Sequence, residues 1–90
     1  MNPIFQRSRA VEPHHIRMAR SGLGISIRDL AQRTGLNKAT IVRLEAGMLV
    51  RNSTIEIIRT ELEAAGAEFL ISDDAARIAV SIKDRDNEIP

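Results

Sequence analysis

The chain has 90 residues, which corresponds to one small domain with a core of limited extent. It contains no cysteine, which excludes a disulfide framework and a thiolate zinc site. No apolar run approaches the ~20 residues of a membrane span, and the N-terminus lacks the layout of a signal peptide. We therefore expect a cytoplasmic protein with no membrane segment. With two Phe and neither Trp nor Tyr, stacking on single-stranded bases is not expected.

Charge is unevenly distributed along the chain. Residues 1–52 contain nine basic and three acidic side chains, whereas residues 53–90 contain four basic and nine acidic ones. The net charge of +1 hides this difference. A cationic half favours a polyanionic partner such as nucleic acid, with the acidic half turned away from it. Halves of small domains also differ in charge without any function, but an imbalance of this size fits that alternative less well.

Residues 1–12 show no helical or strand periodicity and include Arg7 and Arg9. We expect a flexible basic arm, which could follow a DNA minor groove next to the main binding site. A disordered terminus with incidental arginines fits these residues equally well.

The first helix is expected to begin at Pro13, because proline suits the first helical turn, and to end at Gly22. His14 and His15 are adjacent, so they cannot share a helix face and make a poor metal pair. We expect both histidines to be solvated.

The segment Ser26–Gly47 (SIRDLAQRTGLNKATIVRLEAG) predicts two short helices joined by a tight turn. Ser26 can cap the first helix, and Gly35 can end it in the left-handed conformation that glycine adopts easily. Asn37 can cap the second helix, which Gly47 ends. Two helices that cross steeply at so short a turn form a helix-turn-helix.

Ile41 and Leu44 are expected to face inward at helical spacing. The outward face of the second helix then carries two cations and few apolar groups: Lys38, Ala39, Thr40, Val42 and Arg43. Such a helix fits a DNA major groove, where its N-terminal residues reach base edges. An ordinary helical hairpin in a small bundle explains the same spacing, so the spacing alone leaves both interpretations open.

This segment resembles the lambda-repressor/Cro-like, or XRE, family of helix-turn-helix proteins. The matching residues are Ser26, Leu30-Ala31, Gly35-Leu36, Ile41, Leu44-Glu45 and Gly47. The resemblance extends over residues 16–62 and implies a four-helix DNA-binding domain. Ile27 departs from the family, which most often has a phosphate-contacting glutamine there, and we expect the neighbouring Arg28 to compensate.

The resemblance also implies an ion pair between the first and third helices. In the family, an arginine at the position of Arg20 pairs with a glutamate at the position of Glu45. We expect this pair to be partly buried and to fix the geometry of the domain more than its stability.

Two sets of DNA contacts follow. The residues expected at base edges are Lys38, Ala39, Thr40 and Arg43. The residues expected at phosphates are Arg28, Asn37, Arg51, Asn52, Ser53 and Thr54.

The fourth helix is expected to begin after a Ser53 cap and to end at Gly66. Its free N-terminal N–H groups, together with Arg51 and Asn52, can form a phosphate clamp. The alternative is that these residues only cap the helix and interact with water.

After Gly66, residues 67–71 and 77–83 alternate as two short strands around a turn at residues 72–75, which predicts a β-hairpin. A lone hairpin is marginal in water, so we expect two copies to join their hairpins in a twofold homodimer. Cro-like proteins use C-terminal strands in this way. The expected interface residues are Phe69, Ile71, Ile78, Val80 and Ile82. The alternative is a monomer whose hairpin folds back on its own helices.

The expected fold is thus mainly α with a C-terminal β-hairpin. Its parts are a flexible arm (1–12), a helix-turn-helix domain (13–66), a dimerising hairpin (67–84) and a frayed tail (85–90).

The sequence contains no nucleophile–base pair, glycine-rich phosphate loop or metal-ligand cluster, so we expect no enzyme activity, cofactor or metal. The expected function is a sequence-specific regulator, a repressor, that binds a palindromic operator in double-stranded DNA as a homodimer. The alternative is an antitoxin or antiactivator that uses its acidic half to bind a partner protein. The cations of the third helix favour DNA, because a pure interaction module does not need them.

Overall fold

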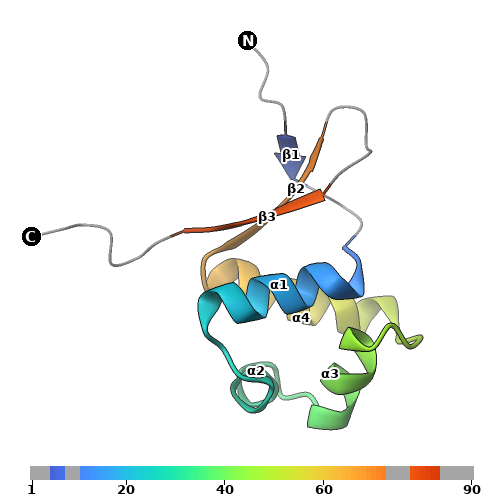
Figure 1. Cartoon of the computed structure of the whole chain (residues 1–90). Helices are drawn as coiled ribbons and strands as arrows, with labels where there is room; N and C mark the ends of the chain where they lie inside the picture. The colour runs from blue at the N-terminus through green and yellow to red at the C-terminus, as the bar shows by residue number, and fades with distance from the viewer. Residues whose placement is uncertain (1–4, 8–10, 73–77, 84–90) are drawn as a thin grey trace, which may run out of the picture.

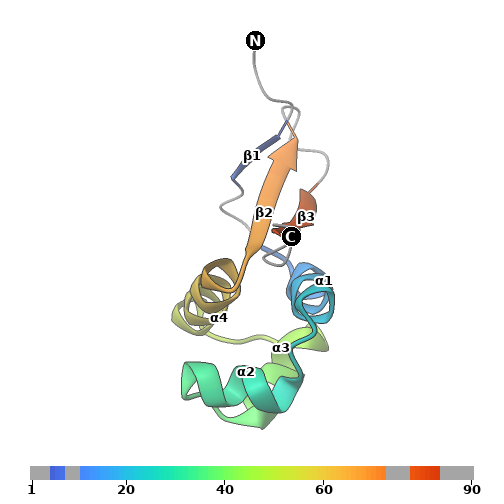
Figure 2. The same cartoon turned by 90° about the vertical axis from the view of Figure 1, so that its left-hand side faces the viewer.

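The computed structural model describes residues 5–7, 11–72 and 78–83. The elements in chain order are β1 (Phe5–Arg7), α1 (Pro13–Leu23), α2 (Ile27–Thr34), α3 (Lys38–Glu45), α4 (Asn52–Ala64), β2 (Ala67–Ser72) and β3 (Ile78–Ile82). The fold is mainly α with a C-terminal hairpin, which confirms the expected class. The sheet lies over α1 and α4, and α2 and α3 occupy the end of the molecule farthest from it (Figures 1 and 2). None of the described helices combines the length and hydropathy that crossing a bilayer requires.

Side-chain caps set the boundaries of α2 and α3. The Ser26 hydroxyl accepts a hydrogen bond from the Asp29 N–H at 3.0 Å, and Asn37 Oδ1 accepts one from the Ala39 N–H at 2.9 Å. Gly35 joins the two helices with φ of 76°, a conformation that strains other residues. These local interactions confirm the expected helix-turn-helix.

Two helix boundaries differ from the sequence-based expectation. α1 runs through Gly22 to Leu23, and its C-cap is Gly24, which adopts a φ of 72°. Gly22 lies inside the helix, and β3 passes close to it: a Cβ on Gly22 would lie 3.1 Å from Ile82 Cγ1, so this position favours glycine. α4 begins at Asn52, so its N-cap is Arg51 and Ser53 lies in the first turn, where it caps nothing. The α4 expectation was wrong because backbone bonds from Thr54 and Ile55 to the Arg51 carbonyl start the helix without a side-chain cap.

His15 is buried, contrary to the expectation that both histidines are solvated. Its Nδ1 accepts a hydrogen bond from the Glu12 N–H at 3.0 Å, so the ring satisfies a backbone donor ahead of α1. Burial lowers the pKa of His15, and the neighbouring His14 adds to this effect, while Glu12 opposes it. His14 itself is exposed.

The sheet has the order β1-β2-β3, and both pairs are antiparallel. Phe5 pairs with Ser72 and Arg7 with Leu70, so residues 5–7 form a strand where the sequence predicted a flexible arm. This pairing joins positions more than sixty residues apart and leaves no local periodicity to detect. The remaining described part of the arm, residues 11–12, leads into α1, and Arg9 lies outside the described residues.

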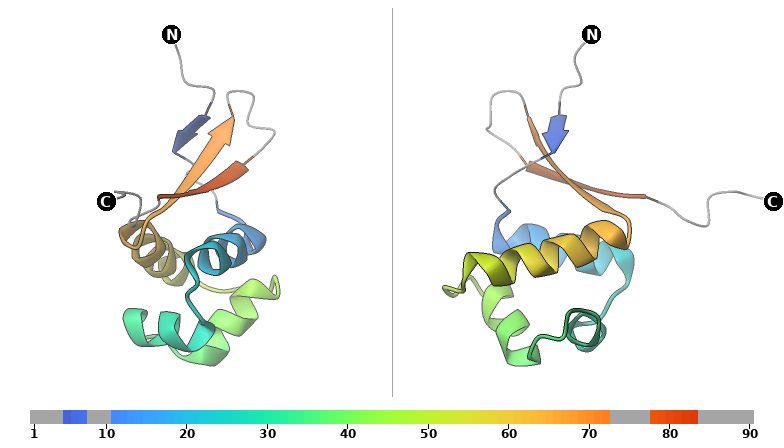
Figure 3. Two further views of the ribbon diagram at one scale, coloured as in Figure 1. Left: turned by 60° about the vertical axis from the view of Figure 1, so that its left-hand side comes forward. Right: turned by 180° about the vertical axis from the view of Figure 1, so that it is seen from behind.

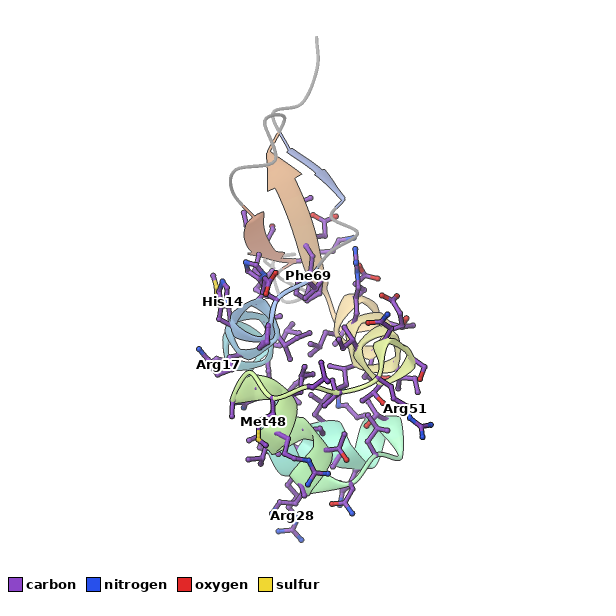
Figure 4. All side chains as sticks on the ribbon, turned by 90° about the vertical axis from the view of Figure 1, so that its right-hand side faces the viewer. His14, Arg17, Arg28, Met48, Arg51 and Phe69 are labelled. Atoms are coloured by element: carbon purple, nitrogen blue, oxygen red, sulfur yellow. The ribbon has the colours of Figure 1, made fainter. Side chains whose placement is uncertain are left out.

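The sheet and the four described helices enclose one core, and Figure 3 shows the sheet lying across α1 and α4 with α2 and α3 beyond them. The core is formed by Ile16, Ala19, Ile25, Leu30, Ala31, Ile41, Leu44, Ile58, Leu62, Ala67 and Phe69. Phe69 is completely buried, and the Arg59 guanidinium lies 5.7 Å from its ring centroid. Figure 4 shows Phe69 pointing from the sheet into the space between the helices. The expected dimer contact by Phe69 was therefore wrong, because this large side chain fills the core of its own protomer.

The hairpin packs on its own helices, with Val80 partly buried against the core and Ile82 more exposed at the end of β3. The alternative that the sequence analysis kept, a monomer, included this folding of the hairpin onto its own helices. The side chains of Ile71 and Ile78, two further expected interface residues, lie outside the described part of the structure.

Candidate nucleic-acid interface

The outward face of α3 carries the side chains that the sequence analysis assigned to bases. Ile41 and Leu44 are buried in the core, which fixes the rotation of the helix about its axis. Lys38, Ala39 and Arg43 are exposed as a result, and Thr40 is partly exposed. We call Lys38, Ala39, Thr40, Val42 and Arg43 the recognition face. The structure thus brings all four predicted base-contacting residues onto one side of a short helix.

Arg20 of α1 holds the C-terminal end of α3. Its Nε donates to Glu45 Oε2 at 2.7 Å and its Nη2 donates to Oε1 at 3.0 Å, which makes a bidentate ion pair. A third bond runs from Arg20 Nη1 to the Ile25 carbonyl at 3.0 Å. The hydrogen bond to Glu45 raises the pKa of Arg20, so the guanidinium stays charged at every relevant pH. The expected ion pair is confirmed, with side chains that keep only 18% and 7% of their surface exposed.

Arg17 provides a second contact that the sequence analysis missed. Its Nη1 donates a hydrogen bond to the backbone carbonyl of Glu45, one of the free carbonyls at the C-terminus of α3. Arg17 and Arg20 lie three residues apart and so project from one face of α1. Together they bind both the carboxylate and the carbonyl of Glu45. The spacing of the two arginines was visible in the sequence, but their shared target was not.

The candidate phosphate contacts lie at the N-terminal ends of α2, α3 and α4. Arg28 is exposed in the first turn of α2, and Arg51 is exposed at the N-cap of α4. Both project outward from the molecule (Figure 4). Asn52 and Ser53 are exposed in the first turn of α4, and Thr54 is partly buried there. The N-terminal N–H groups of α4 point out of the same turn and favour an anion.

Asn37 can cap α3 and bind a phosphate at the same time. Its Oδ1 is occupied by the Ala39 N–H, which leaves the two amide protons on Nδ2 as donors at the exposed N-terminus of α3. A phosphate could therefore bind to Nδ2 while the cap stays intact.

The charge of this surface is strongly positive. From Leu36 to Ile55 the sequence contains Lys38, Arg43 and Arg51 but only one acid, Glu45. Glu45 is buried and neutralised by Arg20, so it does not offset the exposed cations. The one acid near the other end of the surface is Asp29, which is exposed in the first turn of α2.

A family model described as helix-turn-helix (HTH_3) matches residues 16–60, which is half of the chain. The chain belongs to the XRE-type helix-turn-helix family. It is therefore a DNA-binding regulator of the XRE type, and its partner is double-stranded DNA. The match ends inside α4, so the three-stranded sheet lies outside it. No curated protein matches the chain significantly.

Proposed function

We propose that this XRE-family protein is a transcriptional repressor that binds a palindromic operator as a homodimer, with α3 in the major groove. The observation that carries the proposal is the recognition face, which is exposed, cationic and held in orientation from behind by two arginines of α1. Repression would follow when the bound dimer covers a promoter, without any further activity.

Each base-contacting residue has a chemical preference. Lys38 and Arg43 match guanine, whose O6 and N7 atoms accept hydrogen bonds in the major groove. The Ala39 methyl matches the methyl of thymine, and the Thr40 hydroxyl can donate or accept. Binding at guanines is therefore expected to dominate the sequence preference.

The phosphate contacts would fix the register of α3 without specifying sequence. Arg28 at the start of α2 and Arg51 at the start of α4 are exposed on the elements before and after α3, so we expect them to bind the two strands that border one major groove. Asn37, Asn52, Ser53 and Thr54 add neutral donors at the N-termini of α3 and α4. These contacts predict a steep decrease of affinity with salt.

The open edge of β3 is the proposed dimer contact. The Lys83 N–H donates to the Gly66 carbonyl at 2.7 Å, which directs the backbone of Lys83 toward β2. Since backbone direction alternates along a strand, the N–H groups of Val80 and Ile82 face away from β2. No described strand pairs with that edge. Two copies could pair their β3 edges across a twofold axis, with Ile82 contributing apolar contact.

Two measurements test this function. Sedimentation of the wild-type chain should give a dimer, and Ile82→Pro, which removes an edge donor, should shift it to monomer while Ser81→Ala does not.

Fluorescence anisotropy should show tight binding to DNA from upstream of the protein's own gene, or to a selected site, that resists unrelated competitor DNA. Binding that the competitor abolishes at equal concentration would contradict sequence-specific repression.

A second function, binding of a partner protein as an antitoxin or antiactivator, is supported by one observation. A shallow cavity of about 380 Å³ between α2 and α4 is lined by Arg33, Thr34, Glu56, Ile57, Thr60 and Glu61. Ile57 is exposed there, and the carboxylates of Glu56 and Glu61 line the same cavity. If this surface binds a protein, Ile57→Ser should abolish co-purification of that protein and leave DNA affinity unchanged.

A further inference from the structure

Exposed apolar side chains concentrate at α3 and the loop that follows it. Among the described residues, six large apolar side chains are exposed, and three of them are Val42, Met48 and Leu49. Val42 belongs to the helix that presents the recognition face, where its side chain is 49% exposed. It is absent from the core and from the residues packed against the core. Folding of the described domain therefore does not explain a branched apolar residue here.

The position of Val42 on α3 is defined by its helical neighbours. It lies one turn beyond Lys38, at a spacing of four residues, and beside Arg43. Ala39 and Arg43 form the adjacent row with the same spacing. The recognition face thus presents two cations, Lys38 and Arg43, on one diagonal and two apolar side chains, Ala39 and Val42, on the other. Because Val42 and Arg43 are consecutive and both exposed, we expect the bases that they meet to be near neighbours in the groove.

We propose that Val42 contacts the C5-methyl group of a pyrimidine, either thymine or 5-methylcytosine, and thereby determines specificity at that base pair. The inference rests on the proposed sequence-specific function and deepens it. In the major groove this methyl is the largest apolar group on a base-pair edge. The other groups that distinguish the base pairs there are donors and acceptors, and the isopropyl group of valine would remove their bound water without replacing the hydrogen bonds.

The cation next to Val42 also predicts which base lies beside the methylated pyrimidine. Arg43 prefers a guanine, so the expected target is a methylated pyrimidine beside a guanine. Thymine carries the methyl in ordinary DNA, whereas cytosine carries it only after methylation. The C5-methyl is the shared chemistry, and the two sources are separated by experiment.

The test starts with selection of preferred duplexes by the full wild-type chain. Each thymine of the selected site is then replaced by deoxyuridine, which removes only the methyl, and Kd is measured by anisotropy. For wild type, at least one position in each half-site besides any thymine that meets Ala39 should lose about fourfold in affinity, the value of one buried methyl group. For Val42→Ala, deoxyuridine at that position should change Kd by less than twofold.

A cytosine series separates the two sources. With a cytosine–guanine pair at the sensitive position, 5-methylcytosine should bind wild type more tightly than cytosine, and Val42→Ala should bind both alike. If only thymine restores affinity, the proposal holds for thymine and fails for 5-methylcytosine.

The matched control is Met18→Ala, because Met18 is an apolar side chain of similar exposure, 50%, on α1. This variant should respond to deoxyuridine like wild type.

The proposal is overturned if Val42→Ala and wild type lose equal affinity at every thymine, or if the selected site has no pyrimidine methyl at all. Selection that returns no preferred sequence would instead refute the proposed function itself.

Discussion

The two sides of the helix-turn-helix are held in different ways. On the side of α1, Arg20 binds Glu45 through two short hydrogen bonds between largely buried side chains. On the side of α4, Arg33 of α2 meets Glu61 at 3.4 Å, with 46% and 28% of the side chains exposed. Water and salt screen the second pair, whereas the first is largely removed from both. We infer that the orientation of α3 is set mainly from α1.

The largest expected effect comes from removing the buried carboxylate. Glu45→Ala leaves the Arg20 guanidinium without its carboxylate partner, and we expect a loss of about 3 kcal/mol in the free energy of unfolding. Urea denaturation measures this loss. Glu56→Ala removes an exposed glutamate and should cost under about 0.5 kcal/mol. If Arg20→Met and Glu45→Ala destabilise additively when combined, the two side chains are not coupled and the comparison fails.

Arg17→Met should have an intermediate effect, because it keeps the apolar stem but removes the bond to the Glu45 carbonyl. We expect a loss of about 1 kcal/mol in unfolding free energy. Since the bond fixes the end of α3, the ratio of specific to non-specific DNA affinity should also decrease. The slope of log affinity against log salt should stay unchanged. A shallower slope would show that Arg17 binds a phosphate instead.

His15 should make the α1 side sensitive to pH. The pKa of His15 is lowered in the folded chain from its ordinary value of about 6.5. Below pH 6.5, the unfolded chain therefore binds a proton at His15 more readily than the folded chain does. The contribution of neutral His15 to the free energy of unfolding is complete above pH 6.5, and it is lost as the pH falls through the pKa of the folded state. Denaturation at pH 7.5, 6.5 and 5.5 should show this decrease, and His15→Gln should reduce it. His14→Gln, which changes the exposed neighbour, should keep most of the decrease.

The smallest effect is expected at the α4 side. Arg33→Ala breaks the exposed pair with Glu61 and should change the free energy of unfolding by less than about 0.5 kcal/mol. The affinity for specific DNA should also stay near the wild-type value. A loss comparable to that of Glu45→Ala would show that the α2–α4 pair stabilises the domain as much as the α1–α3 pair does.

The helix-turn-helix could be predicted from sequence because its signals are local. Ser26 and Asn37 cap helices within three residues of their own positions, and Gly35 occupies the one turn position that requires a left-handed backbone. Inward Ile41 and Leu44 follow from helical spacing alone. The Arg20–Glu45 pair is not local, and it became predictable only through the family resemblance.

The sheet and its packing depend on contacts between distant parts of the chain, and here the sequence was less informative. Strand β1 pairs with β2 across the length of the domain, and nothing in residues 5–7 marks them as a strand. The position of Phe69 fits the alternation of a strand. Alternation alone does not tell whether that face of the strand packs on the protein's own helices or on a second copy. Arg59 is buried along Phe69 although charge alone would place it in water.

The central claim is that α3 contacts bases whereas the start of α4 contacts phosphates. The most direct test compares Arg43→Ala and Arg51→Ala on the preferred duplex and on a scrambled duplex of equal length. Arg43→Ala should lose about 1–3 kcal/mol on the preferred duplex and much less on the scrambled one. Arg51→Ala should weaken both equally and reduce the salt slope by about one. Equal losses on both duplexes for Arg43→Ala would contradict the placement of α3 in the major groove.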